Sequence, residues 1–249
     1  MTDSAHIMSA FDADLERIQN LILEMGGLAE SQISDSADAL RQRDNERAQA
    51  VIIADKRIDA LELEVDQEVV RVLALRQPIA QDLRTVVTVL KIAGNLERIG
   101  DYAKNNAKRA AAISHAQPVG SSSGTIRRMS RATGDMLRDA LDAYMKGDAV
   151  LAEDVRQRDE DVDLMYNGLF RELLTHMMED PRAITACMHL LFVAKNIERI
   201  GDHITGIAEQ VIYTVTGSLP EEDRPKGDNT PYTETGDGLA PAPDAPKDS

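Results

Sequence analysis

Tryptophan is absent from this 249-residue chain, and cysteine occurs only once, as Cys187. A single cysteine excludes an internal disulfide and is typical of proteins from a reducing compartment. Aromatic residues make up only 3% of the sequence, although hydrophobic residues make up 43%. A core assembled from aliphatic side chains and methionine favours helices packed on helices, and therefore an all-α fold.

Basic residues are also in deficit. The chain has 28 Lys and Arg against 43 Asp and Glu, which gives a formal net charge of −15. An acidic surface repels phosphate backbones, so we expect no nucleic-acid binding. No apolar run reaches the ~18–20 residues that a membrane-spanning helix needs, and the acidic N-terminus lacks the apolar segment of a signal peptide. We expect a cytoplasmic protein that meets membranes only through partners.

Proline is scarce wherever it would interrupt a helix. Of the nine prolines, only Pro78, Pro118 and Pro181 precede residue 219, and proline is largely excluded from helix interiors. Apolar residues recur at the three-and-four spacing of buried helical stripes. This pattern predicts six long helices, at about 9–43, 45–76, 78–116, 124–146, 148–178 and 181–217.

The predicted helix boundaries depend on capping residues and helix breakers. Asp44 is expected to cap the second helix, and Gly147-Asp148 should end the fourth and cap the fifth. Gln77-Pro78 and Asp180-Pro181 each have the form of an N-cap followed by proline at the first helical position. We therefore expect the third and sixth helices to begin at these prolines.

An internal repeat organises the chain. Asn-Leu-Glu-Arg-Ile-Gly-Asp at 95–101 returns 101 residues later as Asn-Ile-Glu-Arg-Ile-Gly-Asp at 196–202. A repeated unit indicates one structural module used twice. We predict two tandem, similar three-helix bundles from an internal duplication, at 1–117 and 125–218. A linker is expected at 118–124, and the acidic, Pro-rich segment 219–249 is predicted to be a disordered tail.

Acid pairs at four-residue spacing mark both halves. Two carboxylates that project from one helical face repel each other, unless a positive group lies between them. The predicted turn of the first hairpin is at Pro78. Along the sequence, the acids of the helix before Pro78 and those of the helix after it lie at equal distances from this turn. In the second hairpin the acids are placed in the same way on either side of the 180–181 bond. Four carboxylates should therefore lie at one level of each hairpin. The eight acids are Asp55, Asp59, Glu97, Asp101, Asp159, Asp163, Glu198 and Asp202.

Metal binding is the first interpretation of these acids. Carboxylate oxygens suit hard cations, so Mg, Mn, Fe or Zn, held singly or in multinuclear clusters, are the candidates. The alternative is that they are solvated surface acids, balanced by Arg98, Lys104, Lys195 and Arg199. Gly100 and Gly201 favour a close approach to the helix backbone, either by a ligand or by a neighbouring helix.

No catalytic constellation is evident. The sequence has no Gly-rich phosphate loop, no Ser/His/Asp set and no Glu-x-x-His pair, and His203 points away from the motif acids around the helix. We expect a protein that is not an enzyme. A metal-dependent enzyme and a metal-storage protein remain as alternatives.

Taken together, the two Glu-Arg-Ile-Gly-Asp helices, the Asp-x-x-x-Asp helices before them and the duplicated plan resemble the PhoU family of phosphate-transport accessory proteins. The likeness runs from about His6 to Gly217. It includes Pro78-Ile-Ala-Gln-Asp-Leu-Arg84 and the ending Ala208-Glu-Gln-Val-Ile-Tyr-Thr-Val-Thr-Gly217.

The resemblance implies a function. PhoU proteins are two three-helix bundles, often homodimers, with metal sites at motifs that match the eight acids named above. They act at the cytoplasmic face of the phosphate ABC transporter, through its ATPase subunit, and with its sensor histidine kinase. There they restrain phosphate uptake and keep the phosphate-starvation response off. One departure is that the family commonly places Asn four residues after the motif Asp. Asn105 matches, but Gly206 does not, so we expect a weaker second metal site.

Overall fold

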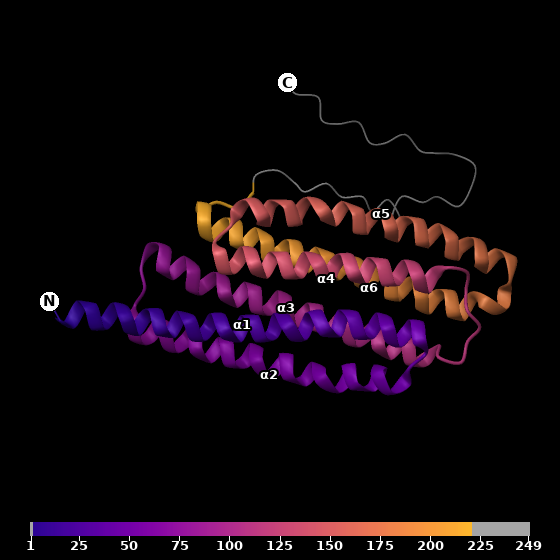
Figure 1. Cartoon of the computed structure of the whole chain (residues 1–249), viewed down its shortest axis with the longest axis horizontal. Helices are drawn as coiled ribbons and strands as arrows, with labels where there is room; N and C mark the ends of the chain where they lie inside the picture. Colours follow the sequence, from indigo (N-terminus) through magenta and orange to yellow (C-terminus); the bar gives the residue numbers. More distant parts are fainter. Residues whose placement is uncertain (1, 221–249) are drawn as a thin grey trace, which may run out of the picture.

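The computed structural model describes residues 2–220, with side chains from residue 10 onward. Its six long helices run in antiparallel succession (Figure 1). They are α1 (Thr2–Gln42), α2 (Asn45–Arg76), α3 (Ala80–Ala112), α4 (Ser122–Lys146), α5 (Ala149–Glu179) and α6 (Ile184–Thr216), with a short 3-10 helix, η1 (Pro181–Ala183), before α6. The prediction of an all-α fold with six helices is confirmed, and the predicted tail, 219–249, lies outside the described residues except for 219 and 220.

The two halves pack side by side along their length. Helices α1 to α3 form one three-helix layer and α4 to α6 the other, with α3 packed along α6 and α1 along α4. Helices α2 and α5 lie on the outer sides, each against the other two helices of its own half. Buried aliphatic residues from all six helices form one continuous core. In the described part of the chain, no helix is long and apolar enough to span a membrane.

Several helix ends follow the expected capping chemistry. The Asp44 carboxylate accepts a hydrogen bond from the Arg47 backbone N–H at 3.0 Å, at the start of α2. Asp148 accepts from two backbone N–H groups at the start of α5. Gly147 ends α4 with φ of 62°, a left-handed conformation that glycine adopts without steric cost. Asp180 caps η1, which has Pro181 in its first turn, but this turn is a 3-10 helix, so α6 begins at Ile184, three residues later than the predicted start at Pro181.

The predicted start of α3 at Pro78 was wrong. Gln77 ends α2 in the left-handed conformation, with φ of 48°, and Ile79 is extended. Gln77 is thus the C-cap of α2, with its backbone N–H donated to the Leu73 carbonyl, so it does not serve as the N-cap of a helix starting at Pro78, and the extended Ile79 takes that position instead. Helix α3 therefore begins at Ala80 and ends at Ala112, four residues earlier than expected.

Two further boundaries also differ from the predictions. Helix α1 begins at Thr2 rather than near residue 9, because residues 2–9 contain no proline or glycine to stop it. The predicted linker at 118–124 is too long, since α4 begins at Ser122. The chain turns instead at Gly120, with φ of 44°, and the Ser121 carbonyl already accepts the first helical hydrogen bonds.

Candidate functional site: two carboxylate clusters

The first cluster lies where α2 packs against α3. The predicted register is confirmed, because the Lys104 ammonium bridges Asp55 of α2 and Asp101 of α3, with a distance of 2.5 Å to the Asp101 carboxylate. Asp55 is buried, Glu97 and Asp101 are half-buried, and Asp59 is exposed at the edge of the cluster. The positive group between these acids is therefore a lysine of the chain itself, one of the balancing residues considered above.

Electrostatics show that the lysine does not neutralise the whole cluster. Burial raises the pKa of Glu97 to about 7, and the charges of Asp101 and Glu62 add to this. Burial also raises the pKa of Asp55, although Lys104 opposes the shift. For Lys104, burial lowers the pKa, but the ion pairs with Asp101 and Asp55 outweigh it and raise it. The charged form of Glu97 is thus disfavoured by burial and by neighbouring carboxylates, and the ammonium does not compensate for this.

Glu62 is a member of the cluster that the sequence reasoning missed. Its pKa is raised by burial and by the charges of Asp66 and Asp59. Because it follows Asp59 by three residues, it projects from the same face of α2. Its spacing of three residues from Asp59 and four from Asp66 is a signal that the sequence carries, but the predicted set kept only acid pairs that recur in both halves.

The second cluster is more deeply buried. Asp159 and Asp163 of α5 and Glu198 of α6 are all buried, and Asp202 is half-buried. The Lys195 ammonium contacts the Glu198 carboxylate at 2.8 Å, so a lysine again lies among the acids.

Gly100 and Gly201 leave room for a side chain of the neighbouring helix. A Cβ added at Gly201 would overlap the Asp159 carboxylate, whose Cγ lies 3.4 Å away. A Cβ at Gly100 would lie 2.9 Å from Ile58 and 3.4 Å from the Asp55 carboxylate. In both halves the glycine therefore lets the aspartate of the preceding helix lie against the helix backbone, which also confirms the predicted register of α5 and α6.

These side chains do not form a metal-ligand shell as they are arranged. Within residues 2–220, no three His, Cys, Asp or Glu side chains converge closely enough to hold an ion together. The donor set is nevertheless all carboxylate, which suits hard cations. A metal ion at the first cluster would compete with Lys104 for the oxygens of Asp55 and Asp101.

Two residues singled out in the sequence lie between the halves rather than in a cluster. The His203 ring nitrogen Nδ1 lies 2.8 Å from the Asn95 Oδ1 of α3. Gly206, where the family pattern has Asn, lies beside Asn95, because a Cβ there would be 3.2 Å from the same oxygen. Here a small residue makes room for the contact between α3 and α6.

Comparisons with known proteins agree with the duplicated architecture. The family model described as PhoU domain matches the chain twice, over residues 22–110 and 126–211. The phosphate-specific transport system accessory protein PhoU homolog of Caulobacter vibrioides (strain NA1000 / CB15N) is 48% identical over 223 residues, 90% of this chain and 97% of that protein. The homolog of the same description from Rhizobium meliloti (strain 1021) is 46% identical over 233 residues, 91% of this chain and 95% of that protein.

Solved structures show the same likeness. The crystal structure of PhoU from Pseudomonas aeruginosa matches with a TM-score of 0.81 and 42% identity, over 84% of this chain and all of that one. The phosphate transport system regulatory protein PhoU from Streptococcus pneumoniae matches with a TM-score of 0.79 and 29% identity, over 85% of this chain and all of that one.

Proposed function

Since the chain belongs to the PhoU family, we propose that it is a cytoplasmic negative regulator of phosphate uptake and of the phosphate-starvation response. It acts as an adaptor between the phosphate ABC transporter, at the ATPase subunit, and the phosphate-sensing histidine kinase. The names of its relatives support the link to phosphate transport. It is proposed to be a homodimer without catalytic activity, which light scattering and a screen for phosphatase activity would test.

One observation carries the adaptor role: an exposed apolar pair occurs in each half at equivalent positions. Leu83 and Val87 of α3 are 40% and 41% exposed, and Ile184 and Met188 of α6, 101 residues later, are 43% and 41% exposed. Each pair lies near the start of its helix, and these two helix starts are at opposite ends of the molecule (Figure 1). Large apolar residues that are exposed at equivalent positions in both halves of the chain suit the docking of partner proteins. Two separate surfaces match two partners.

The test is to change one pair at a time. Leu83→Asp/Val87→Asp and Ile184→Asp/Met188→Asp are each expected to weaken binding to one partner by about tenfold or more, as for central interface residues. Binding is measured with the purified ATPase subunit and with the cytoplasmic part of the kinase. Ile53→Asp, at an exposed apolar residue of α2 outside these pairs, is the control. Full binding of both partners by both double variants would refute this docking model.

Metal binding at the eight acids is the second part of the proposal. It is supported by the all-carboxylate donor set and by the pKa of Glu97, which burial raises first and the charges of Asp101 and Glu62 raise further; a bound cation would relieve this penalty on the charged form. The residues that would hold the ions are the eight predicted acids, joined by Glu62. Bound metal would brace the hairpins, and it would require Lys104 to leave the oxygens of Asp55 and Asp101.

Metal content by mass spectrometry of tag-free protein tests this directly. Wild type is compared with a Glu97→Gln/Asp101→Asn/Glu198→Gln/Asp202→Asn variant, which is expected to lose the metal. Lys104→Met removes the competing ammonium, so it should bind Mn²⁺ more tightly than wild type, while being less stable when stripped of metal. Unchanged Mn²⁺ affinity in Lys104→Met, or equal metal content in wild type and the fourfold variant, would overturn the site assignment.

A further inference from the structure

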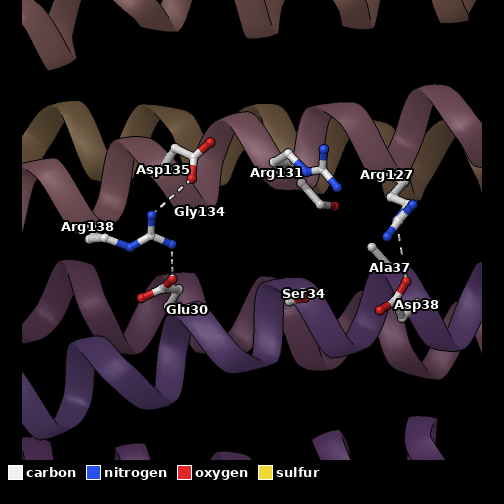
Figure 2. A pocket seen from close by; sticks show the side chains of 10 residues that line it. Glu30, Ser34, Ala37, Asp38, Arg127, Arg131, Gly134, Asp135 and Arg138 are labelled. Carbon is white, nitrogen blue, oxygen red and sulfur yellow. Dashed lines mark hydrogen bonds and ion pairs between the residues drawn. The ribbon is translucent and has the colours of Figure 1, made fainter.

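A polar hollow lies between α1 and α4, where the two halves of the molecule meet (Figure 2). Its volume is about 150 Å³. The hollow exists because small residues face each other there: Ser34 and Ala37 on α1, Ser130 and Gly134 on α4. Gly134 is buried, yet a Cβ built on it would meet no atom within 4 Å. The missing side chain therefore leaves open space rather than a close helix contact.

A buried hydroxyl lines this hollow without a hydrogen-bond partner. Ser130 is only 5% exposed, and its Oγ makes no hydrogen bond among the described residues. Its neighbour Thr133, by contrast, donates to backbone carbonyls of its own helix. A buried polar group that lacks a partner costs free energy, which a bound acceptor would recover.

An arginine without an ion pair lies beside this hydroxyl. Arg127, Arg131 and Arg138 of α4 line the hollow, and all three are exposed. Arg138 contacts Glu30 and Asp135, and Arg127 contacts Asp38 at 3.6 Å. Figure 2 shows Arg131 between these two ion pairs, and within residues 10–220 no carboxylate pairs with it. Asp135, four residues further on and within reach of such a pair, contacts Arg138 instead, at 3.2 Å.

The lining of the hollow itself carries three arginines and the three carboxylates of Glu30, Asp38 and Asp135. A surplus of positive charge lies next to its Arg127 end, on residues outside the lining. The single carboxylate of Asp38 is shared by three guanidinium groups, those of Arg41, Arg47 and Arg127, at 3.4 to 3.6 Å. One acid cannot neutralise three bases, and Asp35 adds only a longer contact of 3.9 Å to Arg47. Such a surplus is notable in a chain whose formal net charge is −15.

We propose that this hollow between α1 and α4 binds a tetrahedral oxyanion of the phosphate type. Arg131 presents a planar fork of N–H donors that matches phosphate oxygens, and the Ser130 hydroxyl donates to the same anion. Arg127 and Arg138 are held beside it by their own ion pairs. Because both halves line the hollow, the anion would bridge them. This binding goes beyond the adaptor role and does not depend on it, since it concerns the purified chain alone.

Titration calorimetry of the full-length protein with inorganic phosphate is the test. Arg131→Gln is expected to weaken binding by about tenfold or more, the usual effect of losing a charged hydrogen bond. Gly134→Leu should block binding because its side chain fills the hollow. Ser130→Ala should weaken binding without lowering the melting temperature of phosphate-free protein, because the hydroxyl has no partner to lose. Phenyl phosphate, titrated in parallel, separates free phosphate from a phosphoryl group carried on another molecule.

Two control variants distinguish a specific anion site from general electrostatic attraction between phosphate and the protein. Arg128→Gln removes the same charge from an exposed arginine of α4 that contacts Thr125 and does not line the hollow. Gly168→Leu places the same side chain at an exposed glycine of α5 with open space around it. Both controls should bind phosphate as wild type does, and far-UV circular dichroism checks that every variant is folded. Failure of wild type to bind either anion, or an equal loss in Arg128→Gln and Arg131→Gln, would overturn the proposal.

Discussion

Replacing Gly201 with alanine should destabilise the protein, although alanine is the better helix former. In an open helix position this change gains about 1 kcal/mol. At Gly201 the new methyl group would overlap the carboxylate of Asp159, which is only 1% exposed and has little room to move. Overpacking a buried site costs about 1–3 kcal/mol, and displacing a buried polar group from its contacts costs a similar amount. The net expectation is a loss of about 2 kcal/mol.

Urea denaturation of metal-free protein measures this loss as a lower midpoint at an unchanged slope. Gly168→Ala is the matched control, since its Cβ would meet no atom within 4 Å, and it should raise stability by about 0.5–1 kcal/mol. The two substitutions should therefore differ in sign. In an Asp159→Ala background, Gly201→Ala should lose its penalty. A stabilising effect of Gly201→Ala in the wild-type background would refute the close approach of Asp159 to α6.

Two further predictions concern pH. Burial raises the pKa of Glu97 from 4.5 to about 7, so the folded state loses stability as pH rises through this range. In metal-free protein, Glu97→Gln should therefore add about 2 kcal/mol of stability above pH 7 and nothing near pH 4. An equal gain at both pH values in urea titrations would contradict this. Burial raises the pKa of Asp14, but Arg71 and Arg76 outweigh it and lower the pKa below 3.8. This carboxylate therefore stabilises the fold above pH 3.8 and less as pH falls below it, so Asp14→Asn should cost about 2 kcal/mol at pH 7 and little near pH 2. A cost that stayed constant down to pH 2 would contradict the assigned ion pairs.

Sequence periodicity predicted the helices well because each buried stripe is a local property of one helix. The positions of the acids relative to the turns also predicted their register, as the Lys104 bridge between Asp55 and Asp101 shows. Helix ends were less predictable where two rules competed. Gln77 could serve either as the N-cap of a helix starting at Pro78 or as the C-cap of α2; it ends α2, and α3 therefore begins at Ala80.

The environment of the acids could not be predicted in the same way. Sequence spacing placed four carboxylates at one level of each hairpin but did not show that lysine ammonium groups contact them. It gave no sign that Gly206 packs beside Asn95 of the other half. The hollow with Arg131 was also invisible, because α1 and α4 are about a hundred residues apart and only their packing brings small residues face to face.

The sequence by itself determined the duplicated helical plan, the family and the level at which the acids lie, because repeats, helical stripes and distances to a turn are written along the chain. Tertiary structure decided which charges are neutralised and which are not. Glu97 keeps its repulsion while Asp55 and Asp101 share an ammonium group, and Arg131 lacks a carboxylate in the described part of the chain while Arg138 contacts two. Those outcomes depend on burial and on distances of a few ångströms between helices, which the order of residues does not record.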